Sequence, residues 1–404
     1  YDPHVMEAVA EYARTEGVPR SVAFAKAKSY AREIVPGFST AAYFGFAIWV
    51  ARKLSQAFYS VQLGGGDSQT LRGIDNKSAV VFVMNHRSNM DYVLVTWLAA
   101  DRSALSYAVG EWARVWPLKA LIRAMGAYFI RRRYSSPLYR AVLARYVQMS
   151  IQEGVTQAMF PEGGLSLNGT VGPAKKGLLH YIVRDFNPTN ERDVVFVPVA
   201  LNYDRVLEDR ILISASETGE RRFRVRLREA AGWIWQLIWL KLRGKFHKFG
   251  YAAVCYGAPV SLQDFMTNHP NASTEALADT LMTRIRAAVP LLPVPLAAAA
   301  MVRAGGSATM ATLLEKGGAL IAEAGEGRAN VHLPEGRAET ALKSGIEALI
   351  LRGILEEKDG TIHIGPGQDS TLGFYAASVL QRLAEPEPEV EQTPTVEMPD
   401  ASET

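Results

Sequence analysis

Residues 78–91 read Ser-Ala-Val-Val-Phe-Val-Met-Asn-His-Arg-Ser-Asn-Met-Asp, and this stretch decides the fold. Its first seven residues form a short, apolar run rich in β-branched side chains, which predicts a buried strand over Ser78–Met84. A histidine, His86, follows directly, and helical periodicity resumes from about Met90 to Ala100. The stretch therefore places polar residues between a buried strand and a helix.

The same alternation of strands and helices continues on both sides of this stretch. Further strands are predicted at 127–131, 156–160, 194–201 and 251–256, with helices at 115–125 and 138–153. This order predicts an α/β fold, a layered and largely parallel sheet flanked by helices. In such sheets the site lies in the loops that follow the strand ends.

Composition divides the chain into four predicted parts. We expect an N-terminal helical region at 1–63, which ends at Gly64-Gly65-Gly66, and an α/β domain at 64–267 that carries the polar motifs. A small, mostly helical C-terminal domain is expected at 268–384, with a hairpin around Asp359-Gly360. The acidic, proline-rich segment 385–404 is expected to be a disordered tail.

Charge and cysteine content restrict the possible functions. The formal net charge is +3, but seven acidic residues and no basic ones lie in 385–404, so the remaining body carries about +10. Such a body is attracted to phospholipid headgroups, nucleic acid or an acidic carrier protein. The single cysteine, Cys255, excludes an intramolecular disulfide framework and is expected to be a small buried residue.

His86 and Asp91 form the first candidate site. The strand end can present the imidazole while the helix start presents the carboxylate, which fixes the tautomer by accepting a hydrogen bond from one ring nitrogen. The other nitrogen is then free to take a proton from an alcohol, as a general base does. Taken alone, the spacing also fits an N-capping aspartate near an unrelated histidine.

Two further motifs follow predicted strands. Phe160-Pro161-Glu162-Gly163-Gly164 is a strand end and a turn with one carboxylate, whose glycines allow a ligand to approach the backbone closely. Arg131, Arg132 and Arg133 follow another strand, and guanidinium groups suit a phosphorylated substrate, although a solvated basic loop is the alternative.

These blocks, taken in order with Val197-Pro198-Val199, resemble the four motifs of the glycerolipid acyltransferase family. The string Asn85 to Tyr92 and the string Gly126 to Arg132 resemble its glycerol-3-phosphate acyltransferase branch. Two later segments, 256–262 and 372–383, resemble that branch as well, so the similarity covers most of residues 75–384.

The resemblance implies transfer of a fatty acyl group from acyl-CoA or acyl-carrier-protein to the sn-1 hydroxyl of glycerol 3-phosphate. It implies His86 as the base, Asp91 as its orienting partner, no acyl-enzyme, and neither a metal nor a cofactor. The expected substrate-binding residues lie in or beside the motifs: Arg87, Ser88, Arg131, Arg132, Arg133, Glu162, Gly163 and Gly164. The chain also lacks a Gly-x-Ser-x-Gly elbow, a Walker loop and a dinucleotide fingerprint.

One position departs from the family pattern. Many relatives carry an arginine after Glu-Gly-Gly, whereas Leu165 stands there in this chain. Lys175 and Lys176 are the expected substitutes, unless they form a solvated surface pair. The acceptor could therefore also be lysophosphatidate or dihydroxyacetone phosphate. A catalytically inactive lipid-binding protein is the alternative outside enzymes, and nucleic-acid binding is not expected because the basic residues adjoin tryptophan-rich apolar runs.

A lipid product predicts a membrane-associated, peripheral protein on the cytoplasmic face, which is the inner membrane in a bacterium. Residues 221–248 combine cations with Trp233, Trp235 and Trp239, a pattern typical of a helix lying in the plane of an anionic membrane surface. A buried core helix is the alternative. Residues 41–53 are a second candidate, for which core and membrane are equally expected, and no apolar run reaches the length of a span.

Overall fold

The computed structural model describes residues 2–37, 45, 48–64, 73–98, 106–109, 127–131, 136–184, 186–189, 192–219, 248–270, 273–324 and 338–384. The predicted tail at 385–404 lies outside these residues, as do Arg132, Arg133 and the three tryptophans at 233, 235 and 239.

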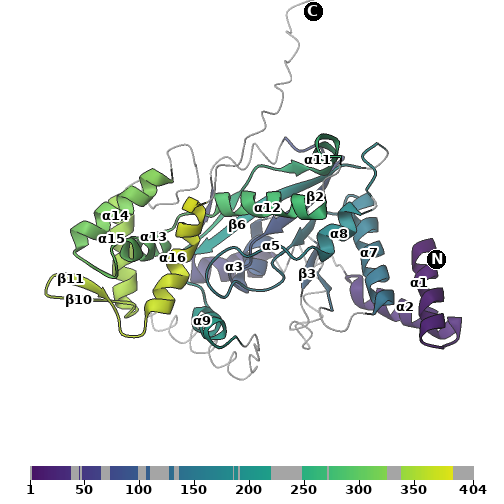
Figure 1. The fold of residues 1–404 in the computed structure, drawn as a ribbon, viewed down its shortest axis with the longest axis horizontal. Coiled ribbons are helices and arrows are strands. Elements are labelled where there is room, and N and C mark those ends of the chain that lie inside the picture. Colours follow the sequence, from purple (N-terminus) through teal and green to yellow (C-terminus); the bar gives the residue numbers. More distant parts are fainter. Residues whose placement is uncertain are drawn as a thin grey trace, which may run out of the picture.

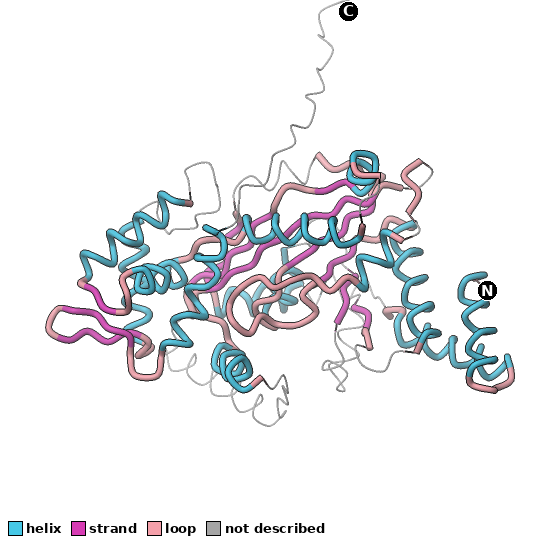
Figure 2. The backbone as a smooth tube through the Cα atoms, in the orientation of Figure 1, coloured by secondary structure: helices cyan, strands magenta, loops and turns pink. Residues whose placement is uncertain are grey.

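An eight-stranded sheet forms the centre of the molecule (Figure 2). Its strands are β1 (Ser60–Leu63), β2 (Ala79–Met84), β3 (Ser106–Val109), β4 (Ala127–Phe129), β5 (Gln157–Met159), β6 (Val194–Tyr203), β7 (Tyr251–Tyr256) and β8 (Val260–Ser261). They lie in the order β1-β7-β6-β2-β5-β3-β4, and β8 pairs with β6. The strands from β6 to β4 run parallel to one another, while β7 runs antiparallel to β6.

Alternating side chains on β2 and β6 separate two hydrophobic cores. Val81 and Val83 of β2 point to one face of the sheet, whereas Phe82 and Met84 point to the other. Strand β6 does the same with Phe196 on one face and other apolar residues, among them Val195 and Leu201, on the other. Because successive side chains of a strand point to opposite faces, a continuous apolar strand needs cover on both faces.

Helices α7 (Pro137–Gln152), α8 (Gly177–Val183) and α12 (Thr274–Ala288) cover the face of Val81 (Figure 1). Helices α1 (Pro3–Thr15) and α2 (Arg20–Ile34) pack on α7 at the outer side. Local capping defines where several of these helices start. The Ser136 hydroxyl accepts from the Tyr139 N–H, and Pro137 occupies the first turn of α7, where no N–H partner is needed.

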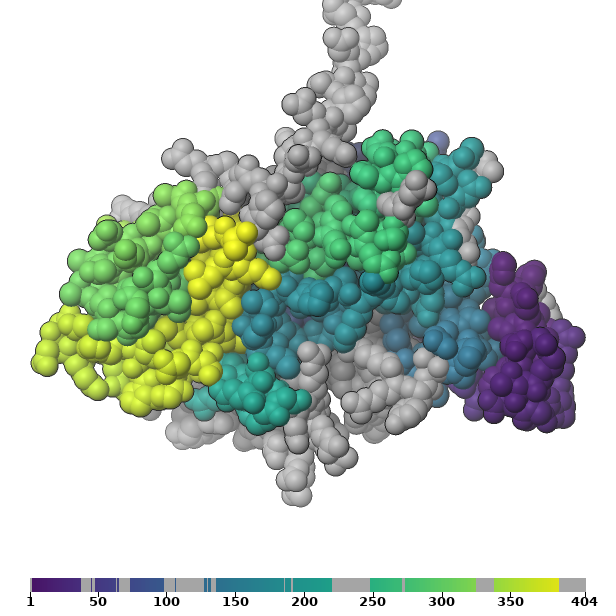
Figure 3. All heavy atoms as spheres, viewed as in Figure 1, coloured from purple at the N-terminus to yellow at the C-terminus, as the bar shows by residue number. Residues whose placement is uncertain are grey.

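The opposite face is covered by α3 (Ile48–Phe58), α5 (Met90–Leu98) and α9 (Asp209–Thr218), and its core continues into the C-terminal helices. These helices are α13 (Pro293–Arg303), α14 (Met310–Glu323), α15 (Ala338–Leu351) and α16 (Asp369–Ala384), with the short α11 (Leu262–Asn268) preceding α12. A small sheet of β9 (Ser307–Ala308), β10 (Leu355–Lys358) and β11 (Thr361–Ile364) joins them. Figure 3 shows the N-terminal helices and the C-terminal helices at opposite ends of the molecule.

The predicted fold class is confirmed: the chain is a mixed α/β protein with a sheet flanked by helices. The predicted hairpin is also present, and its turn residues Asp359 and Gly360 both have positive φ, at 53° and 73°. The sequence did not predict β1, which lies inside the segment 1–63 that was expected to be helical, nor β3, α8, α9 and α13. The division into four parts stays a prediction.

Candidate active site

Three adjacent strands bring the candidate residues together. Because β6, β2 and β5 are parallel neighbours, their carboxyl ends lie at one edge of the sheet. His86 follows β2 and Glu162 follows β5. The Asn85 side chain joins the end of β2 to β6, since its Nδ2 donates to the Leu201 carbonyl at 3.0 Å and its Oδ1 accepts from the Leu201 N–H at 2.7 Å.

His86 and Asp91 form a buried pair. The distance between His86 Nδ1 and Asp91 Oδ2 is 2.9 Å, and the two side chains are 4% and 0% exposed. With Nδ1 bound to the carboxylate, the tautomer that carries its proton on Nδ1 leaves Nε2 as the basic nitrogen. The spacing of five residues therefore produces the arrangement that a general base requires.

Asp91 is held by the backbone of its own loop and by one distant side chain. Its Oδ2 also accepts from the Arg87 N–H at 2.7 Å and the Ser88 N–H at 3.0 Å. Its Oδ1 accepts from the Tyr203 hydroxyl at 2.5 Å. Asp91 opens α5, so the start of the helix adds a favourable field for the carboxylate. These donors stabilise a carboxylate that has no contact with solvent.

Two aromatic rings contact the imidazole of His86, and one backbone hydrogen bond holds its main chain. Phe160 stacks on it with 4.2 Å between ring centroids, and Tyr92 meets it edge to face at 5.3 Å. The His86 carbonyl accepts from the Ser166 N–H at 2.8 Å. The ring is thus immobilised between β2 and the loop that follows β5.

Glu162 ties this loop to the histidine. Its Oε1 accepts from the His86 N–H at 2.8 Å, and its Oε2 accepts from the Gly172 N–H at 2.9 Å. Burial raises the pKa of the Glu162 carboxyl, although both backbone hydrogen bonds lower it. Both oxygens therefore support the backbone of the site, and the substrate-binding role expected for Glu162 stays a prediction.

The glycines of this turn allow a close approach of chain to chain. Gly163 has a φ of 66°, and a Cβ there would lie 2.8 Å from Lys175 Cδ. Lys175 therefore lies against the turn at Gly163, two residues before Leu165 in the chain. Lys176 forms an exposed ion pair with Glu275 of α12, which is the surface arrangement that the sequence left open.

Arg87 points into the protein. It is 1% exposed, its Nη1 donates to the Gly169 carbonyl, and its guanidinium carbon lies 5.0 Å from the centre of the Phe374 ring in α16. Burial lowers the pKa of the Arg87 guanidinium. Arg87 therefore contacts protein groups in this structure, and the substrate-binding role expected for it stays a prediction.

Ser88 also turns toward protein groups. Its hydroxyl donates to Glu208 Oε2 at 2.8 Å, and Glu208 Oε1 accepts from the Asn89 side chain at 2.9 Å. Burial raises the pKa of Glu208. Ser88 and Asn89 thus fasten the loop between His86 and Asp91 to the segment before α9.

Arg131 lies at the same edge of the sheet but farther along it. Strand β4 is three strands from β2, which corresponds to about 14 Å at the usual strand spacing. Arg131 forms a bidentate ion pair with Glu33 of α2, at 2.8 and 2.6 Å, and lies over the rings of Tyr30 and Tyr139. The ion pair raises the pKa of Arg131 further above its usual range. A phosphate at this position would have to share Arg131 with Glu33.

Sequence reasoning missed Tyr203 and Glu208. Tyr203 is the last residue of β6 and fits the apolar strand pattern, and Glu208 lies in the segment that follows. The signal that could have found them is the rule that site residues follow strand ends, applied to β6 as it was to β2 and β5. Their partners are 112 and 120 positions away, so spacing alone does not reveal them.

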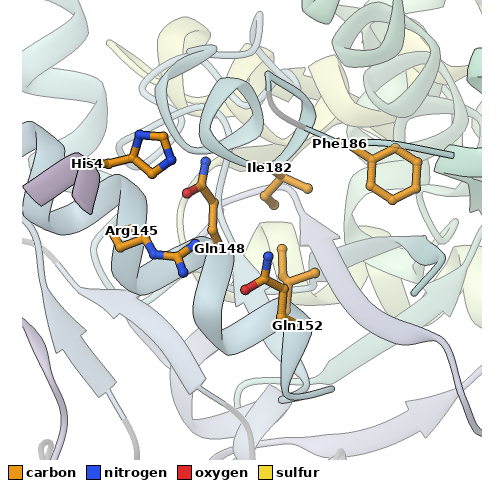
Figure 4. A pocket seen from close by; sticks show the side chains of 7 residues that line it. His4, Arg145, Gln148, Gln152, Ile182 and Phe186 are labelled. Atoms are coloured by element: carbon orange, nitrogen blue, oxygen red, sulfur yellow. The ribbon is translucent and has the colours of Figure 1, made fainter. Parts of the chain in front are cut away.

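One hollow of the described structure lies away from the His86 site. A hollow of about 200 Å³ lies among α1, α7 and α8, and it is lined by polar residues such as His4, Arg145 and Gln148 (Figure 4). None of the predicted site residues lines it. Among the described residues, no three His, Cys, Asp or Glu side chains gather as metal ligands. No described helix has both the length and the apolar character needed to cross a bilayer.

A buried histidine–aspartate pair lies at the carboxyl ends of the parallel strands of an α/β sheet, a geometry that is compatible with general-base chemistry. Comparison with known families gives the particular assignment. Residues 67–202 match the family model described as Acyltransferase, and residues 234–386 match the one described as Glycerol-3-phosphate acyltransferase C-terminal region. The chain belongs to the glycerolipid acyltransferase family, in its glycerol-3-phosphate acyltransferase branch, which confirms the resemblance seen in the motifs.

Curated relatives of this chain are named glycerol-3-phosphate acyltransferases. A glycerol-3-phosphate acyltransferase of Pseudomonas entomophila is 26% identical over 96% of this chain and 48% of its own length. One of Alteromonas mediterranea is 27% identical over 71% of this chain and 36% of its own. The chain thus spans less than half the length of these relatives. Among solved structures, the 1-acyl-sn-glycerophosphate acyltransferase PlsC of Thermotoga maritima is 18% identical, with a TM-score of 0.38, over 60% of this chain and 76% of that one.

Proposed function

We propose that this chain transfers a fatty acyl group from acyl-CoA or acyl-carrier-protein to the sn-1 hydroxyl of glycerol 3-phosphate, giving lysophosphatidate for phospholipid synthesis. The observation that carries the proposal is the buried His86–Asp91 pair, 2.9 Å apart, within a sequence that belongs to this family. Both reactants are anionic, which suits a body that carries about +10 outside the acidic segment 385–404.

The chemistry needs one base and no covalent intermediate. His86 Nε2 takes the proton of the sn-1 hydroxyl while that oxygen attacks the thioester carbonyl carbon. The tetrahedral intermediate then breaks its carbon–sulfur bond, and the departing thiolate takes the proton from the imidazolium. Asp91 holds the Nδ1 proton throughout and stabilises the imidazolium that forms between the two steps. General-base assistance of this kind contributes about 10²–10⁴ in rate.

The phosphate end of the acceptor needs cations near the same edge. Lys175 is the best placed of the described ones, because it lies against Gly163 in the turn that also anchors His86 through Glu162. It therefore substitutes for the arginine that Leu165 replaces. Arg132 and Arg133 keep their proposed role in phosphate binding on the strength of the sequence alone.

Acceptor choice tests the proposal. Purified protein is offered glycerol 3-phosphate, lysophosphatidate and dihydroxyacetone phosphate in separate reactions, each with labelled acyl-CoA or acyl-carrier-protein. We expect acylation of glycerol 3-phosphate at the sn-1 position, and a loss of at least about 10²-fold in His86→Ala. Acylation of lysophosphatidate alone would overturn the acceptor assignment, and undiminished transfer by a folded His86→Ala protein would overturn the role of the base.

We also propose that the protein is peripheral on the cytoplasmic face of an anionic membrane, with α3 as one contact. Trp49 and Leu54 of α3 are 58% and 37% exposed, and Arg52 and Lys53 beside them are exposed as well. Tryptophan favours the headgroup level, and cations favour anionic lipid. The proposal for Trp233, Trp235 and Trp239 stands beside it on sequence grounds.

Vesicle binding tests this second proposal. Sedimentation with vesicles of phosphatidylcholine plus phosphatidylglycerol is compared with phosphatidylcholine alone, at low and high salt. We expect binding to the anionic vesicles that salt weakens, and weaker binding by Trp49→Ser. Leu351→Ser is the matched control, because Leu351 is 83% exposed at the end of α15. Equal binding by Trp49→Ser and wild type would exclude α3 as a contact.

A further inference from the structure

Tyr203 lies at the carboxyl end of β6 and contacts the far side of the catalytic carboxylate. Its hydroxyl donates to Asp91 Oδ1 at 2.5 Å, while Asp91 Oδ2 faces His86. Both Tyr203 and Asp91 are 0% exposed. Tyr203, Asp91 and His86 therefore form one continuous hydrogen-bonded chain that ends at the base.

The three donors on Oδ2 and the single donor on Oδ1 have different origins. Oδ2 is bound by His86 and by two backbone N–H groups of its own loop, which any sequence in this conformation would supply. Within the described residues, Oδ1 has the Tyr203 hydroxyl as its hydrogen-bond donor. The donor to Oδ1 is therefore a side chain of strand β6, which lies 112 positions after Asp91 in the chain.

The ring of Tyr203 is fixed independently of that hydrogen bond. It packs against the Tyr59 ring at 5.3 Å between centroids, and Tyr203 pairs with Ala252 of β7 in the sheet register. Burial and the neighbouring Asp91 raise the pKa of the Tyr203 hydroxyl well above its ordinary value. The hydroxyl therefore remains a donor over the whole pH range in which a histidine titrates.

We propose that Tyr203 is a positioning residue for the acyl transfer: its hydroxyl orients Asp91 and limits how much negative charge the carboxylate presents to His86. The inference rests on the proposed role of His86 as the base. A carboxylate that shares charge with a strong donor on Oδ1 stabilises the imidazolium less, so the Tyr203 hydroxyl sets how strongly Asp91 acts on the base.

Removal of the Tyr203 hydroxyl should move the pH profile in one defined direction. In Tyr203→Phe the full charge of Asp91 acts on the Nδ1 proton of His86, so the imidazolium is favoured. The base is then protonated up to a higher pH than in the wild type. We expect the acidic limb of the pH profile of kcat/KM to move upward by roughly half a unit to one unit.

Other ionisable groups face this pair from the surrounding elements and stay in place in the variant. They are Arg87 in the same loop, Tyr92 of α5, Glu162 after β5, Tyr59 before β1 and Glu208 before α9. Because Tyr203→Phe keeps the ring, the packing that positions these groups is retained. The shift therefore reports the hydroxyl itself.

Tyr203→Phe is measured beside the matched variant Tyr375→Phe, which also removes a buried hydroxyl donated to a carboxylate, at 2.6 Å from Asp209 Oδ2. With acyl-CoA and glycerol 3-phosphate, we expect Tyr203→Phe to move the acidic limb and to lower kcat about 3- to 30-fold, with little change in KM for glycerol 3-phosphate. Tyr375→Phe should lose stability yet keep the limb of the wild type. Equal limbs in Tyr203→Phe and wild type would overturn the inference.

A second readout separates this inference from the proposed function. The titration of His86, followed by ¹⁵N NMR of labelled histidine, should have its midpoint at higher pH in Tyr203→Phe, whether or not the protein acylates glycerol 3-phosphate. An unchanged midpoint would overturn the inference even in an active enzyme. If Tyr203→Phe does not fold, site-specific difluorotyrosine at position 203 supplies a stronger donor, and the midpoint should then move to lower pH.

Discussion

Asp204, next to Tyr203, carries a carboxyl group that is buried among backbone N–H groups. Its Oδ1 accepts from the Val294 N–H at 2.9 Å, and its Oδ2 accepts from the Tyr251 N–H at 2.8 Å. Burial raises the pKa of the Asp204 carboxyl from 3.8 to about 7, although both hydrogen bonds lower it. Asp204 therefore joins the end of β6 to β7 and to the start of α13 at an electrostatic cost that depends on pH.

The sign of that dependence follows from proton linkage. Between the two pKa values, 3.8 unfolded and about 7 folded, the folded protein binds more protons at Asp204 than the unfolded chain does. The contribution of neutral Asp204 to the unfolding free energy is fully present below about pH 4 and is lost as the pH rises to about 7. The loss amounts to at most about 4 kcal/mol.

Asp204→Asn tests this linkage through urea unfolding between about pH 4.5 and 7.5. The wild type should lose unfolding free energy toward pH 7, whereas the variant should lose less. Glu162 and Glu208, whose pKa values burial also raises, contribute equally to both proteins, so the difference isolates Asp204. Identical slopes in the two proteins would contradict the assignment.

Contacts within the site were predictable from the sequence where the two residues are close together along the chain. His86 and Asp91 are five positions apart and share one loop, so a strand followed by a helix already implies their contact. The contacts of Arg87 and Tyr203 depend on which strands and helices become neighbours. Sequence spacing consequently does not reveal that Arg87 packs against Phe374 of α16.

At the scale of elements, the loop after β5 is clamped onto α16. Gly169 has a φ of 85°, and a Cβ there would lie 1.9 Å from the Phe374 carbonyl oxygen. The Gln381 side chain also bonds the backbone of Val171 in both directions, at 2.7 and 3.0 Å. Since the same loop holds His86 through Glu162, α16 supports the position of the base.

Gly169→Ala should therefore impair both stability and acylation. The new methyl group meets backbone rather than a flexible side chain, and the left-handed conformation adds strain, so we expect a loss of about 2–4 kcal/mol in unfolding free energy. Gly177→Ala is the matched control, because nothing lies within 4 Å of a Cβ there. Thermal unfolding and the glycerol 3-phosphate assay measure both effects, and equal behaviour of the two variants would argue against the clamp.

Helices and strands were predictable where the local sequence carries a strong signal of its own. The apolar runs of β2 and β6 and the Asp-Gly hairpin turn are unambiguous local signals. Helix α13 was not predicted, although Pro293 and Pro295 are compatible with it because both occupy its first turn, where prolines are tolerated. Strands β1 and β3 are four residues each, so their pairing in the sheet, rather than their own sequence, defines them.

At the scale of the whole molecule, one hydrophobic core joins the sheet to the C-terminal helices. Met84 and Val197 of the sheet belong to the same buried cluster as Ala298 of α13 and Tyr375 of α16. Helices α13 and α15 lie so close together that a Cβ at Gly345 would be 2.2 Å from the Pro293 carbonyl oxygen. A change in composition near residue 268 suggested a separate C-terminal domain, whereas the sharing of a core is visible only in three dimensions.

This shared core predicts that the sheet and the C-terminal helices unfold together. Gly345→Ala forces α13 and α15 apart and should cost about 2–4 kcal/mol. If the core is one cooperative unit, native-state hydrogen exchange should report the same loss at the amides of β2 and β6 as at those of α13 and α15. Gly318→Ala in α14, where nothing lies within 4 Å of a Cβ, is the control and should leave both sets unchanged. Faster exchange confined to the helices in Gly345→Ala would instead mean that the C-terminal helices form an independent domain, with the boundary near residue 268 that the sequence indicates.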